Sequence, residues 1–580
     1  MGYPYCSAKG SISLTKVKTT RLPPPVKFVL SRYFSSCIQS FLPFSFVFFN
    51  SLLLIFPHLP FCSPLPTIMR LKCTTIAVVA SAASVTFISS TKALPVGLIS
   101  CLQNIKSSSN SSLTTPSSIA YNTDRYGHNL IFEFKPTAIY HPATNEDAAA
   151  AVQCATAFNA AIAPRSGGHS FEGYCEGGKD GALVIDVNKF QQFSMDPATG
   201  IATVGAGTRL GPLYSRVWRA GGYLIPAGVC PSVGVGGHAL GGGIGVLARK
   251  YGMLTHNIVS LTLIDAKGTI RQVSATSDPE LFWALRGAGG GNFGVVTEFQ
   301  FQAHKAPAIV TTMIYHFPLA HFPVVVDAFV AFGQVATDDL TALMFPSSMG
   351  IDLKVNFLGP KDAALSAIAP LLEKTGPPAA AADVREGTWY EAATLWNWLH
   401  GGDLENYISN NNRYMRGRSL IYRKPLTRQE ADIVVKYLSN PPKGGSANYF
   451  IVDMLGGKLD RPDVPSVFDH HKNAVLTMVP FSEWGNPDSG PGLTCPECLK
   501  WSADLAMELR DAYSSGPELE AYQNMMELGM PLSAYYGAEN LPRLQQIKKT
   551  FDPTNVFSFP QSVPLPSDPN IPDPQLVQAI

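Results

Sequence analysis

The 580-residue chain carries 44 Lys and Arg against 43 Asp and Glu, and 46% of its residues are hydrophobic. The formal net charge of +1 gives no electrostatic argument for binding nucleic acid or an anionic membrane surface. Because the length exceeds the usual size of one domain and the apolar content is ample for a large core, we expect two domains.

The first 93 residues have the features of a leader. Met69–Lys72 supplies a charged start, an apolar run follows, and small residues near Ala93 offer a cleavage site. We therefore expect residues 69–93 to be a secretory signal peptide and residues 1–68 to be an upstream extension outside the functional protein. The apolar segment 41–59 leaves a membrane anchor open as an alternative, although prolines interrupt it. The expected location is extracellular.

Strands and helices alternate in the first half of the mature chain. The expected helices are Glu146–Ala160, Pro212–Ala220 and Glu280–Leu285, and the expected strands are Ala161–Pro164, Ala182–Asp186, Ile201–Val204 and Leu261–Asp265. Such interleaving predicts an α/β unit. The Ser/Thr-rich stretch Ser107–Ser118 precedes this unit, and we expect it to be a linker. Its acceptor sequence at Asn110 for N-glycosylation fits an exported chain.

Three glycine-rich loops fall within this first half. They are Pro164–Ser170, Gly228–Gly243 and Arg286–Val296. Glycine lets backbone N–H groups approach an anion closely, so such loops can cradle a pyrophosphate. The first loop contains His169 and the second Cys230. A reactive imidazole and a reactive thiol in two such cradles point to a flavin held by two covalent bonds.

The character of the sequence changes after Ala306. Longer strands are expected at Ile309–Phe317 and Leu353–Leu358, with helices at Asp362–Lys374 and Arg428–Leu438. This pattern fits an antiparallel sheet backed by helices. A last helix is expected at Leu541–Thr550.

Two cysteines stand close together near the end of the second half, at Cys495 and Cys498. They could form half of a zinc site, but no second pair completes four ligands. A local disulfide is the better interpretation.

The three glycine loops and the C-terminal segment Tyr535–Phe557 resemble the FAD-linked oxidases of the vanillyl-alcohol oxidase type. The most similar branch is that of berberine bridge enzyme and fungal glucooligosaccharide oxidase. The resemblance runs from about Cys101 to Phe557. It implies an α+β fold in which a two-part FAD-binding domain of the PCMH type holds an inserted substrate domain, built on an antiparallel sheet backed by helices. It also implies a Cys101–Cys154 disulfide. If Cys230 is attached to the flavin, Cys175 is left unpaired.

The resemblance sets the expected domain boundaries. They are an N-terminal segment and linker at 94–133, the FAD-binding domain at 134–305, the substrate domain at 306–530, a berberine-bridge-like segment returning to the FAD domain at 531–565, and a tail at 566–580.

The resemblance also assigns the cofactor contacts. It implies FAD bound covalently through His169 to the 8α-methyl group and through Cys230 to C6. The other residues expected to contact FAD are Arg165, Ser166, Gly167, Gly168, Ser170, Gly234, Gly236, Gly237, Gly241, Asn292, Gly294, Asn524 and Tyr536. No metal is expected.

The catalytic base is left open by the sequence. Related oligosaccharide oxidases use a Tyr-x-Asn-Tyr segment, whereas this chain has Tyr522-Gln523-Asn524-Met525, and Phe171 replaces the tyrosine expected after His-Ser. Oxidising an alcohol requires a group that takes the hydroxyl proton, and methionine cannot do so. The candidates are Tyr522, Glu483 and Tyr174.

The last expectations concern the role of Val233 and the class of the substrate. A small valine three residues after Cys230 implies room for O2 above the flavin, hence an oxidase that makes hydrogen peroxide. The expected substrate is a hydroxyl-bearing small molecule, with a carbohydrate or oligosaccharide first by resemblance. A phenolic, alkaloid or other secondary metabolite is the alternative that Met525 allows. A flavin-binding protein without redox turnover is a third interpretation.

Overall fold

The computed structural model of the chain describes residues 94–105, 110–380, 382–396, 403–405, 412–485, 493–513 and 520–566. The extension and signal peptide expected at 1–93, and nearly all of the tail, lie outside the described residues. We describe the compact unit that begins at Thr86 by itself. Within the described ranges, no helix is both long enough and apolar enough to cross a membrane.

A four-stranded sheet with the order β1-β2-β4-β3 opens the unit. Three of its strands run parallel, and they are β2 (Ala138–His141), β3 (Ile162–Arg165) and β4 (Leu183–Asp186). Parallel strands need a crossover connection, and α3 (Asn145–Ala157) supplies it between β2 and β3. The helix begins where the Thr144 hydroxyl accepts the Asp147 N–H at 3.1 Å. It ends earlier than the sequence predicts because Asn159 adopts a positive φ of 50°.

The N-terminal part of the described chain packs against this sheet. Helix α1 (Leu94–Gln103) lies on α3, and the Cys101–Cys154 disulfide joins the two helices as expected. Strand β1 (Ser112–Thr114) pairs antiparallel with β2. The expectation that Ser107–Ser118 is a linker was therefore wrong for Ser112–Thr114, because pairing with a distant strand overrides the polar composition of these residues.

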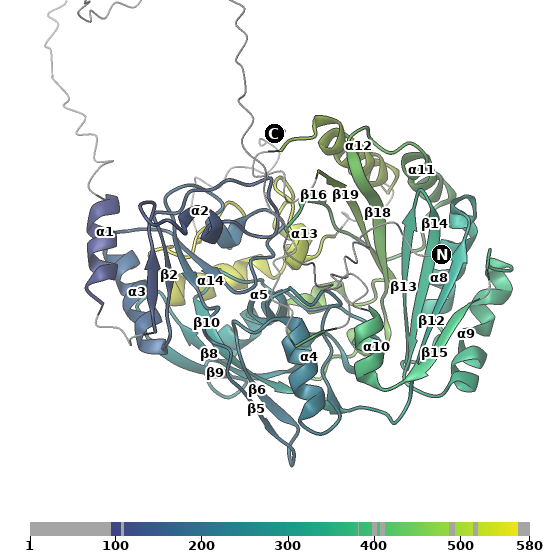
Figure 1. Ribbon diagram of the computed structural model, residues 1–580, viewed down its shortest axis with the longest axis horizontal. Coiled ribbons are helices and arrows are strands. Elements are labelled where there is room, and N and C mark those ends of the chain that lie inside the picture. Colours follow the sequence, from purple (N-terminus) through teal and green to yellow (C-terminus); the bar gives the residue numbers. More distant parts are fainter. Residues whose placement is uncertain are drawn as a thin grey trace, which may run out of the picture. The chain divides into compact units, whose positions relative to one another are not determined.

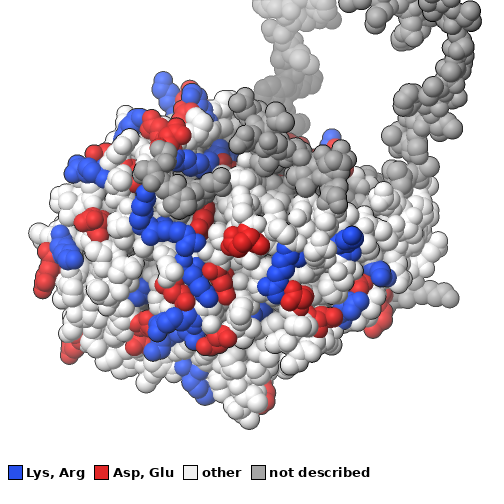
Figure 2. All heavy atoms as spheres, turned by 180° about the vertical axis from the view of Figure 1, so that it is seen from behind, with Lys and Arg blue, Asp and Glu red and all other residues white. Residues whose placement is uncertain are grey.

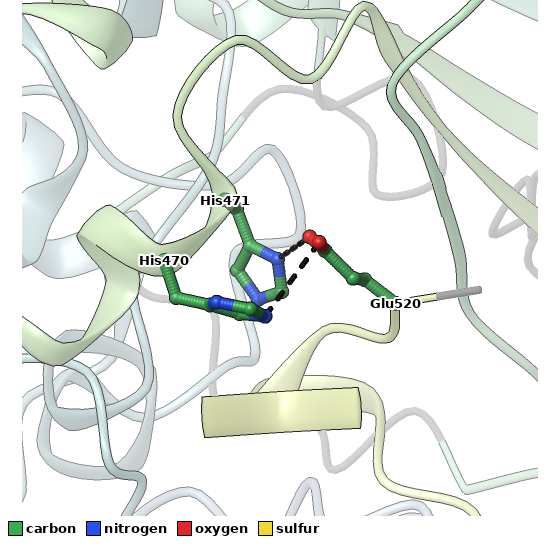
Figure 3. Close-up of side chains that lie close together, drawn as sticks. All are labelled: His470, His471 and Glu520. Carbon is green, nitrogen blue, oxygen red and sulfur yellow. Dashed lines mark hydrogen bonds and ion pairs between the residues drawn. The ribbon is translucent and has the colours of Figure 1, made fainter. Parts of the chain in front are cut away.

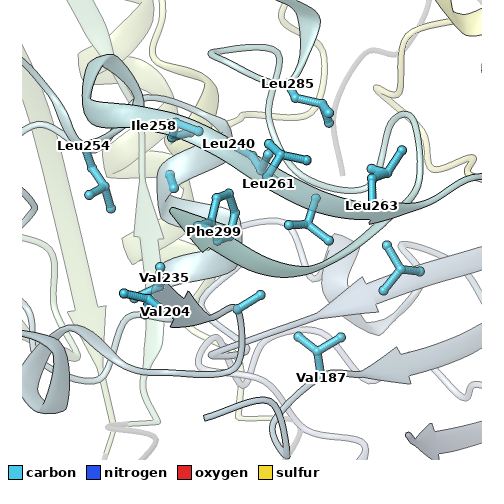
Figure 4. Close-up of a cluster of buried hydrophobic side chains, with 14 of the residues drawn as sticks. Val187, Val204, Val235, Leu240, Leu254, Ile258, Leu261, Leu263, Leu285 and Phe299 are labelled. Carbon is cyan, nitrogen blue, oxygen red and sulfur yellow. The ribbon is translucent and has the colours of Figure 1, made fainter. Parts of the chain in front are cut away.

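A five-stranded antiparallel sheet follows, with the order β5-β6-β10-β8-β9. Its strands are β5 (Phe193–Asp196), β6 (Ile201–Gly205), β8 (Ile258–Ile264), β9 (Ile270–Ser274) and β10 (Val295–Gln302). The helices between them are α4 (Leu210–Arg219), α5 (Val235–Leu240), α6 (Ala248–Tyr251) and α7 (Pro279–Ala284). Figure 4 shows the core that the sheets and helices share, with Val204, Leu261 and Phe299 buried together. The short pair β7 (Tyr223–Leu224) and β11 (His304–Lys305) closes this part.

The second half forms the antiparallel sheet that the sequence predicts. Its order is β15-β12-β14-β13-β18-β19-β16, with β17 also paired to β19. The strands are β12 (Val310–Phe317), β13 (Leu340–Ser347), β14 (Gly350–Phe357), β15 (Asp383–Gly387), β16 (Tyr414–Gly417), β17 (Leu420–Tyr422), β18 (Gly445–Met454) and β19 (Leu476–Trp484). The α+β fold class is therefore confirmed.

Helices cover one face of this sheet (Figure 1). They are α8 (Phe322–Gly333), α9 (Lys361–Thr375), α11 (Arg428–Ser439) and α12 (Pro496–Ala512). Side chains alternate across a strand, so β18 turns Phe450 and Val452 into the helix-covered core and Tyr449 and Ile451 to the opposite face. Helix α12 begins at the Cys495–Cys498 disulfide, which confirms the local pairing. Helix α10 (Trp389–Trp396) packs on α4 and β12.

The last described segment returns to the first half. Helices α13 (Ser533–Tyr536) and α14 (Leu541–Phe551) follow the large sheet, and α14 packs against α7. The backbone N–H of Ile162 in β3 donates to the Val556 carbonyl at 2.7 Å. The last described segment thus packs against the first described half of the chain, while the proposed domain boundaries stay predictions.

The surface agrees with the balanced composition. On the face shown in Figure 2, basic and acidic side chains lie interspersed among broad uncharged areas.

Candidate active site

The loops that carry His169 and Cys230 touch each other through glycine. A Cβ atom on Gly167 would collide with the Gly234 backbone nitrogen, and one on Gly234 would collide with that of Gly167. Ser166 strengthens the contact, since its hydroxyl donates to the Ala206 carbonyl at 2.6 Å and accepts the Gly236 N–H at 3.3 Å. The structure therefore brings the two motifs together at one place, although 61 residues separate His169 from Cys230 in the sequence.

His169 is set up as a neutral imidazole. Its Nε2 atom is buried and has no hydrogen-bond partner among the described residues. The ring stacks on His128, with centroids 4.0 Å apart and planes 13° from parallel. Burial lowers the pKa of His169 well below 6.5, and electrostatic interactions with His128, Arg209, His238 and Arg413 act in the same direction. A neutral ring with a free nitrogen can act as a nucleophile toward an electrophilic carbon.

Cys230 remains a free, partly exposed thiol. Its sulfur lies 3.3 Å from the Ser232 hydroxyl, and Arg413 interacts electrostatically with it. Because Arg413 also acts on His169, the thiol and the imidazole share one electrostatic environment. Val233 is partly exposed on the same loop, where its N–H donates to the Cys230 carbonyl at 3.3 Å.

The glycine loops leave room for a bound group. A Cβ atom on Gly237 would meet nothing within 4 Å, and one on Gly168 would meet only the Gly127 Cα, at 3.7 Å. Ser170 uses its hydroxyl to accept the Tyr174 N–H at 2.9 Å. Backbone amides beside open space, next to an orphaned imidazole nitrogen and a free thiol, fit an FAD whose pyrophosphate lies along the loops.

The sequence predicts that the Arg165 side chain contacts the pyrophosphate, but the structure pairs this side chain with two aspartates. Its guanidinium donates to Asp186 at 2.6 Å, to the Asp124 carboxylate at 3.0 Å and to the Asp124 carbonyl at 2.7 Å. With Arg165 only 5% exposed, the guanidinium serves to fix the loop. Any contact between this residue and a pyrophosphate falls to its backbone.

Four other residues that are expected to contact FAD make bonds or close contacts that brace the loops. Asn292 donates to the Ala288 carbonyl at 2.9 Å and accepts the Val563 N–H at 2.8 Å. Tyr536 donates to the same carbonyl at 3.0 Å. Asn524 packs on Gly241 and donates to the His238 carbonyl at 2.9 Å. The fourth residue, Gly294, permits a close backbone approach to the Ile264 carbonyl.

Tyr522 and Tyr174 are also held by the protein. The Tyr522 oxygen accepts the Gly243 N–H at 2.7 Å and the Asn524 amide at 2.8 Å, and burial raises the pKa of Tyr522 to about 12. Tyr174 donates to Gln561 at 2.6 Å, and burial and the charge of Glu172 raise its pKa. These contacts give both tyrosines a structural task.

Glu483 lies in the cluster that is best placed to accept a proton. It projects from β19 and is 7% exposed. One carboxylate oxygen accepts from Arg413 at 2.5 Å and the other accepts the Tyr449 hydroxyl at 2.8 Å. Tyr449 comes from β18 and Arg413 precedes β16, the two strands that flank β19. Burial and the Glu483 charge raise the pKa of Tyr449 well above 10, so its proton stays on the phenol.

The sequence reasoning missed Arg413, Tyr449 and Asp453. Asp453 lies on β18, where burial raises its pKa to about 6, and its charge acts on Tyr522. The even spacing of Tyr449 and Asp453 along β18 was the one available signal, because side chains at even spacing on a strand share a face. No motif marks these residues, and only the strand pairing collects them.

Apolar side chains form the wall beside Glu483. Phe171 meets Phe481 edge to face with centroids 5.7 Å apart, and Phe481 stacks on Tyr449 at 5.1 Å. Met525 and Phe171 pack against the same cluster, which includes Met415. The two positions where this chain departs from the expected tyrosines therefore lie in one patch, which is more apolar than two phenols would make it.

Comparison with known proteins identifies two matching families. Residues 136–274 match the family described as FAD binding domain, and residues 521–564 match the one described as berberine and berberine like. A xylooligosaccharide oxidase of Thermothelomyces thermophilus is 30% identical over 507 residues, which cover 84% of this chain and 98% of that protein.

Solved structures agree with the sequence relatives. The berberine bridge enzyme-like protein 1 of Physcomitrella patens has a TM-score of 0.73 at 32% identity, covering 81% of this chain and 99% of its own. The glucooligosaccharide oxidase of Acremonium strictum has a TM-score of 0.73 at 25% identity, with the same coverage. That enzyme is described with a 6-S-cysteinyl, 8α-N1-histidyl FAD.

Proposed function

The chain belongs to the berberine bridge enzyme-like family of FAD-linked oxidases, and we propose on this premise that it is a secreted oxidase with bicovalently bound FAD. It takes a hydride from a hydroxyl-bearing carbon and reduces O2 to H2O2. The observation that carries the proposal is the contact between the His169 and Cys230 loops, with the Glu483 cluster acting electrostatically on the same thiol.

His169 and Cys230 are the two attachment points in this proposal. The buried imidazole of His169 and the free thiol of Cys230 are the two kinds of side chain that form the histidyl and cysteinyl links described for the glucooligosaccharide oxidase. When bound, FAD would accept the hydride and pass both electrons to O2. In this proposal the two attachments hold the ring in a fixed position, and the small side chain of Val233 leaves room for O2 beside it.

Glu483 is the proposed proton acceptor. A substrate hydroxyl placed against its carboxylate can donate its proton to the oxygen lone pairs that Arg413 and Tyr449 leave free. Tyr449 keeps its own proton and holds the carboxylate in place through the 2.8 Å hydrogen bond. Arg413 balances the negative charge of the carboxylate before the carboxylate accepts the proton.

The relatives make a carbohydrate or oligosaccharide the first candidate substrate. Xylooligosaccharide and chitooligosaccharide oxidases both match over most of their length. The patch formed by Phe171, Phe481 and Met525 favours a second candidate, a phenolic or other aromatic alcohol, because an apolar ring packs well on aromatic and thioether groups. A flavin-binding protein without turnover is the third interpretation, and it predicts no substrate at all.

Export is proposed from the signal-like leader and is supported by two disulfides, which persist in oxidising compartments. N-terminal sequencing of the exported protein tests it, with Leu94 as the expected first residue.

The test of function combines a substrate panel with one variant. Purified protein is mixed with xylo-, chito- and glucooligosaccharides and with aromatic alcohols, and flavin bleaching and H2O2 are measured. A positioned base contributes about 10²–10⁴-fold in rate, so Glu483→Gln should slow flavin reduction by about that factor without changing the flavin spectrum. Glu508→Gln, which removes an exposed partner of Lys436, is the matched control. Unchanged reduction in Glu483→Gln would move the base elsewhere, and no bleaching by any substrate would favour the third interpretation.

A further inference from the structure

A second cluster of ionisable side chains lies behind Tyr522. Figure 3 shows His470 and His471, from the 3₁₀ turn Val467–His471, converging on Glu520. One ligand atom from each residue lies within 4.8 Å of the others. Phe468 of the same turn packs edge to face against both His471, at 4.8 Å, and Tyr522, at 5.7 Å. The cluster is thus one side chain away from the residue that holds the second glycine loop.

The two histidines each present a nitrogen that lacks a partner. The Nε2 atoms of His470 and His471 are buried and make no hydrogen bond within the described part of the chain. His471 is fully buried and its Nδ1 lies 2.6 Å from one Glu520 oxygen. His470 Nε2 lies 3.6 Å from the other oxygen, while its Nδ1 faces the exposed Glu539 carboxylate at 3.3 Å.

One neutral tautomer of His470 carries its proton on the outer nitrogen, Nδ1, which faces Glu539. When Nδ1–H donates to Glu539, Nε2 carries a lone pair that points toward a carboxylate oxygen of Glu520. Two acceptors then face each other in a buried place, and such a pair is stable only with a cation or a proton between them. A ligating histidine commonly donates its other N–H to a carboxylate, which is the part that Glu539 plays.

The separation of the groups suits a small divalent ion. Zinc lies about 2.0–2.1 Å from histidine nitrogen and carboxylate oxygen, so neighbouring ligands of a tetrahedral ion are about 3.3 Å apart. The observed 3.6 Å between His470 Nε2 and the Glu520 oxygen is close to that spacing. The 2.6 Å contact to His471 is shorter because a proton, which a metal would displace, occupies it.

Arg423 is the charge that opposes a cation here. Its Nε donates to one Glu520 oxygen at 2.6 Å, and its other nitrogens donate to the carbonyls of Lys472 and His470. Because its remaining contacts are to carbonyls, it orients the carboxylate from one side. The oxygen that it contacts is the one facing His470 Nε2 at 3.6 Å, and the second oxygen lies 2.6 Å from His471 Nδ1.

The other group of this type in the described chain is different. Asp124, His141 and Asp186 also lie within 4.8 Å of one another. There Arg165 bridges the two carboxylates, with contacts of 3.0 and 2.6 Å. A guanidinium already stands between the acidic groups at the place a metal would need, so this group is an ion-pair network and serves as an internal control.

We propose that His470, His471 and Glu520 bind a divalent transition-metal ion of the zinc class, with three protein ligands and a fourth position open to water. The ion ties the 3₁₀ turn to the segment that leads into Tyr522, and so stabilises the support of the glycine loop. The proposal does not depend on the flavin chemistry, because metal content is measured independently of turnover.

The experiment uses untagged, flavin-loaded protein. It is dialysed against EDTA, incubated with ZnCl2, desalted and analysed for metal by mass spectrometry. The expected result is about one zinc per chain, a ratio set by the single three-ligand site, together with a higher melting temperature in the presence of zinc. His470→Gln and Glu520→Gln should lose both effects, and His141→Gln from the control group should keep them.

A Co2+ substitution gives a second readout if a variant folds poorly. A tetrahedral site that contains imidazole should add absorption at longer wavelength than the flavin bands in the unaltered protein. Absence of bound zinc in the unaltered protein would overturn the proposal. So would equal zinc retention in His470→Gln, since the metal would then be bound elsewhere.

Discussion

Glu176 gives the sharpest test of the electrostatics around the first glycine loop. It lies in the 3₁₀ turn Tyr174–Glu176 and is 1% exposed, and both of its carboxylate oxygens are buried. Burial raises its pKa from 4.5 to about 8, although the nearby Arg165 and Arg125 favour the charged form. The folded protein therefore holds a neutral Glu176 at pH values where the unfolded chain has already lost the proton.

The sign and size of the effect follow from linkage. A group whose pKa is raised on folding stabilises the protein fully below its unfolded pKa of 4.5, and this contribution is lost as pH rises through about 8. Each pH unit between those values changes the unfolding free energy by 1.36 kcal/mol, so the loss amounts to about 4–5 kcal/mol. Glu176→Gln is neutral at every pH and removes this dependence.

Urea unfolding at pH 5 and at pH 8.5 measures the difference. We expect the Gln variant to gain stability relative to the unaltered protein by several kcal/mol between the two pH values. Other titrating groups cancel, because they are common to both proteins. Glu508→Gln, at an exposed ion pair, should show no such gain. Parallel pH profiles for the unaltered protein and Glu176→Gln would refute the buried, neutral carboxyl.

The remaining predictions concern the flavin site. Acid precipitation should leave the flavin on the protein, and His169→Ala and Cys230→Ala should each retain it through the other residue; release of all the colour from the unaltered protein would contradict two covalent bonds. Val233→Leu should slow reoxidation by O2 and leave reduction by substrate nearly unchanged, as stopped-flow traces of the two half-reactions would reveal; equal slowing of both would mean that the residue shapes the site generally. The double variant Phe171→Tyr, Met525→Tyr should raise oligosaccharide turnover about tenfold or more, since a hydrogen bond to a substrate hydroxyl contributes about 0.5–1.5 kcal/mol and a positioned base more. No gain on sugars, with a loss on aromatic alcohols, would favour the aromatic substrate.

Local sequence signals predicted the parts of the fold that depend on neighbours in the chain. Glycine spacing located the loops around His169 and Cys230, and apolar periodicity located β12 and α11 within one or two residues. The signals failed where the outcome depends on pairing with a distant segment. Strand β1 has a polar composition typical of a linker, and only its pairing with β2 makes it a strand.

Side-chain direction limited the prediction of the site. Arg165 and Asn292 belong to the right motifs, but their neighbours in space are Asp186 and Val563, which no spacing reveals. The cluster of Arg413 and Tyr449 with Glu483 spans 70 residues and three strands. Glu483 was found from the sequence as a lone carboxylate, and its partners became visible only with the register of the sheet.

The hydrogen bond between Tyr522 and Gly243 has a consequence for biosynthesis. The two residues are 279 positions apart, so the loop leaves the ribosome long before the side chain that braces it. At a synthesis rate of about 5–20 residues per second, the interval is about 15–55 s. During that time the nascent loop lacks Tyr522 and Asn524, and a cofactor that needs the braced loop cannot be captured. Flavin loading is thus expected to follow the synthesis of Tyr522, and a truncation product that ends before Tyr522 should emerge colourless.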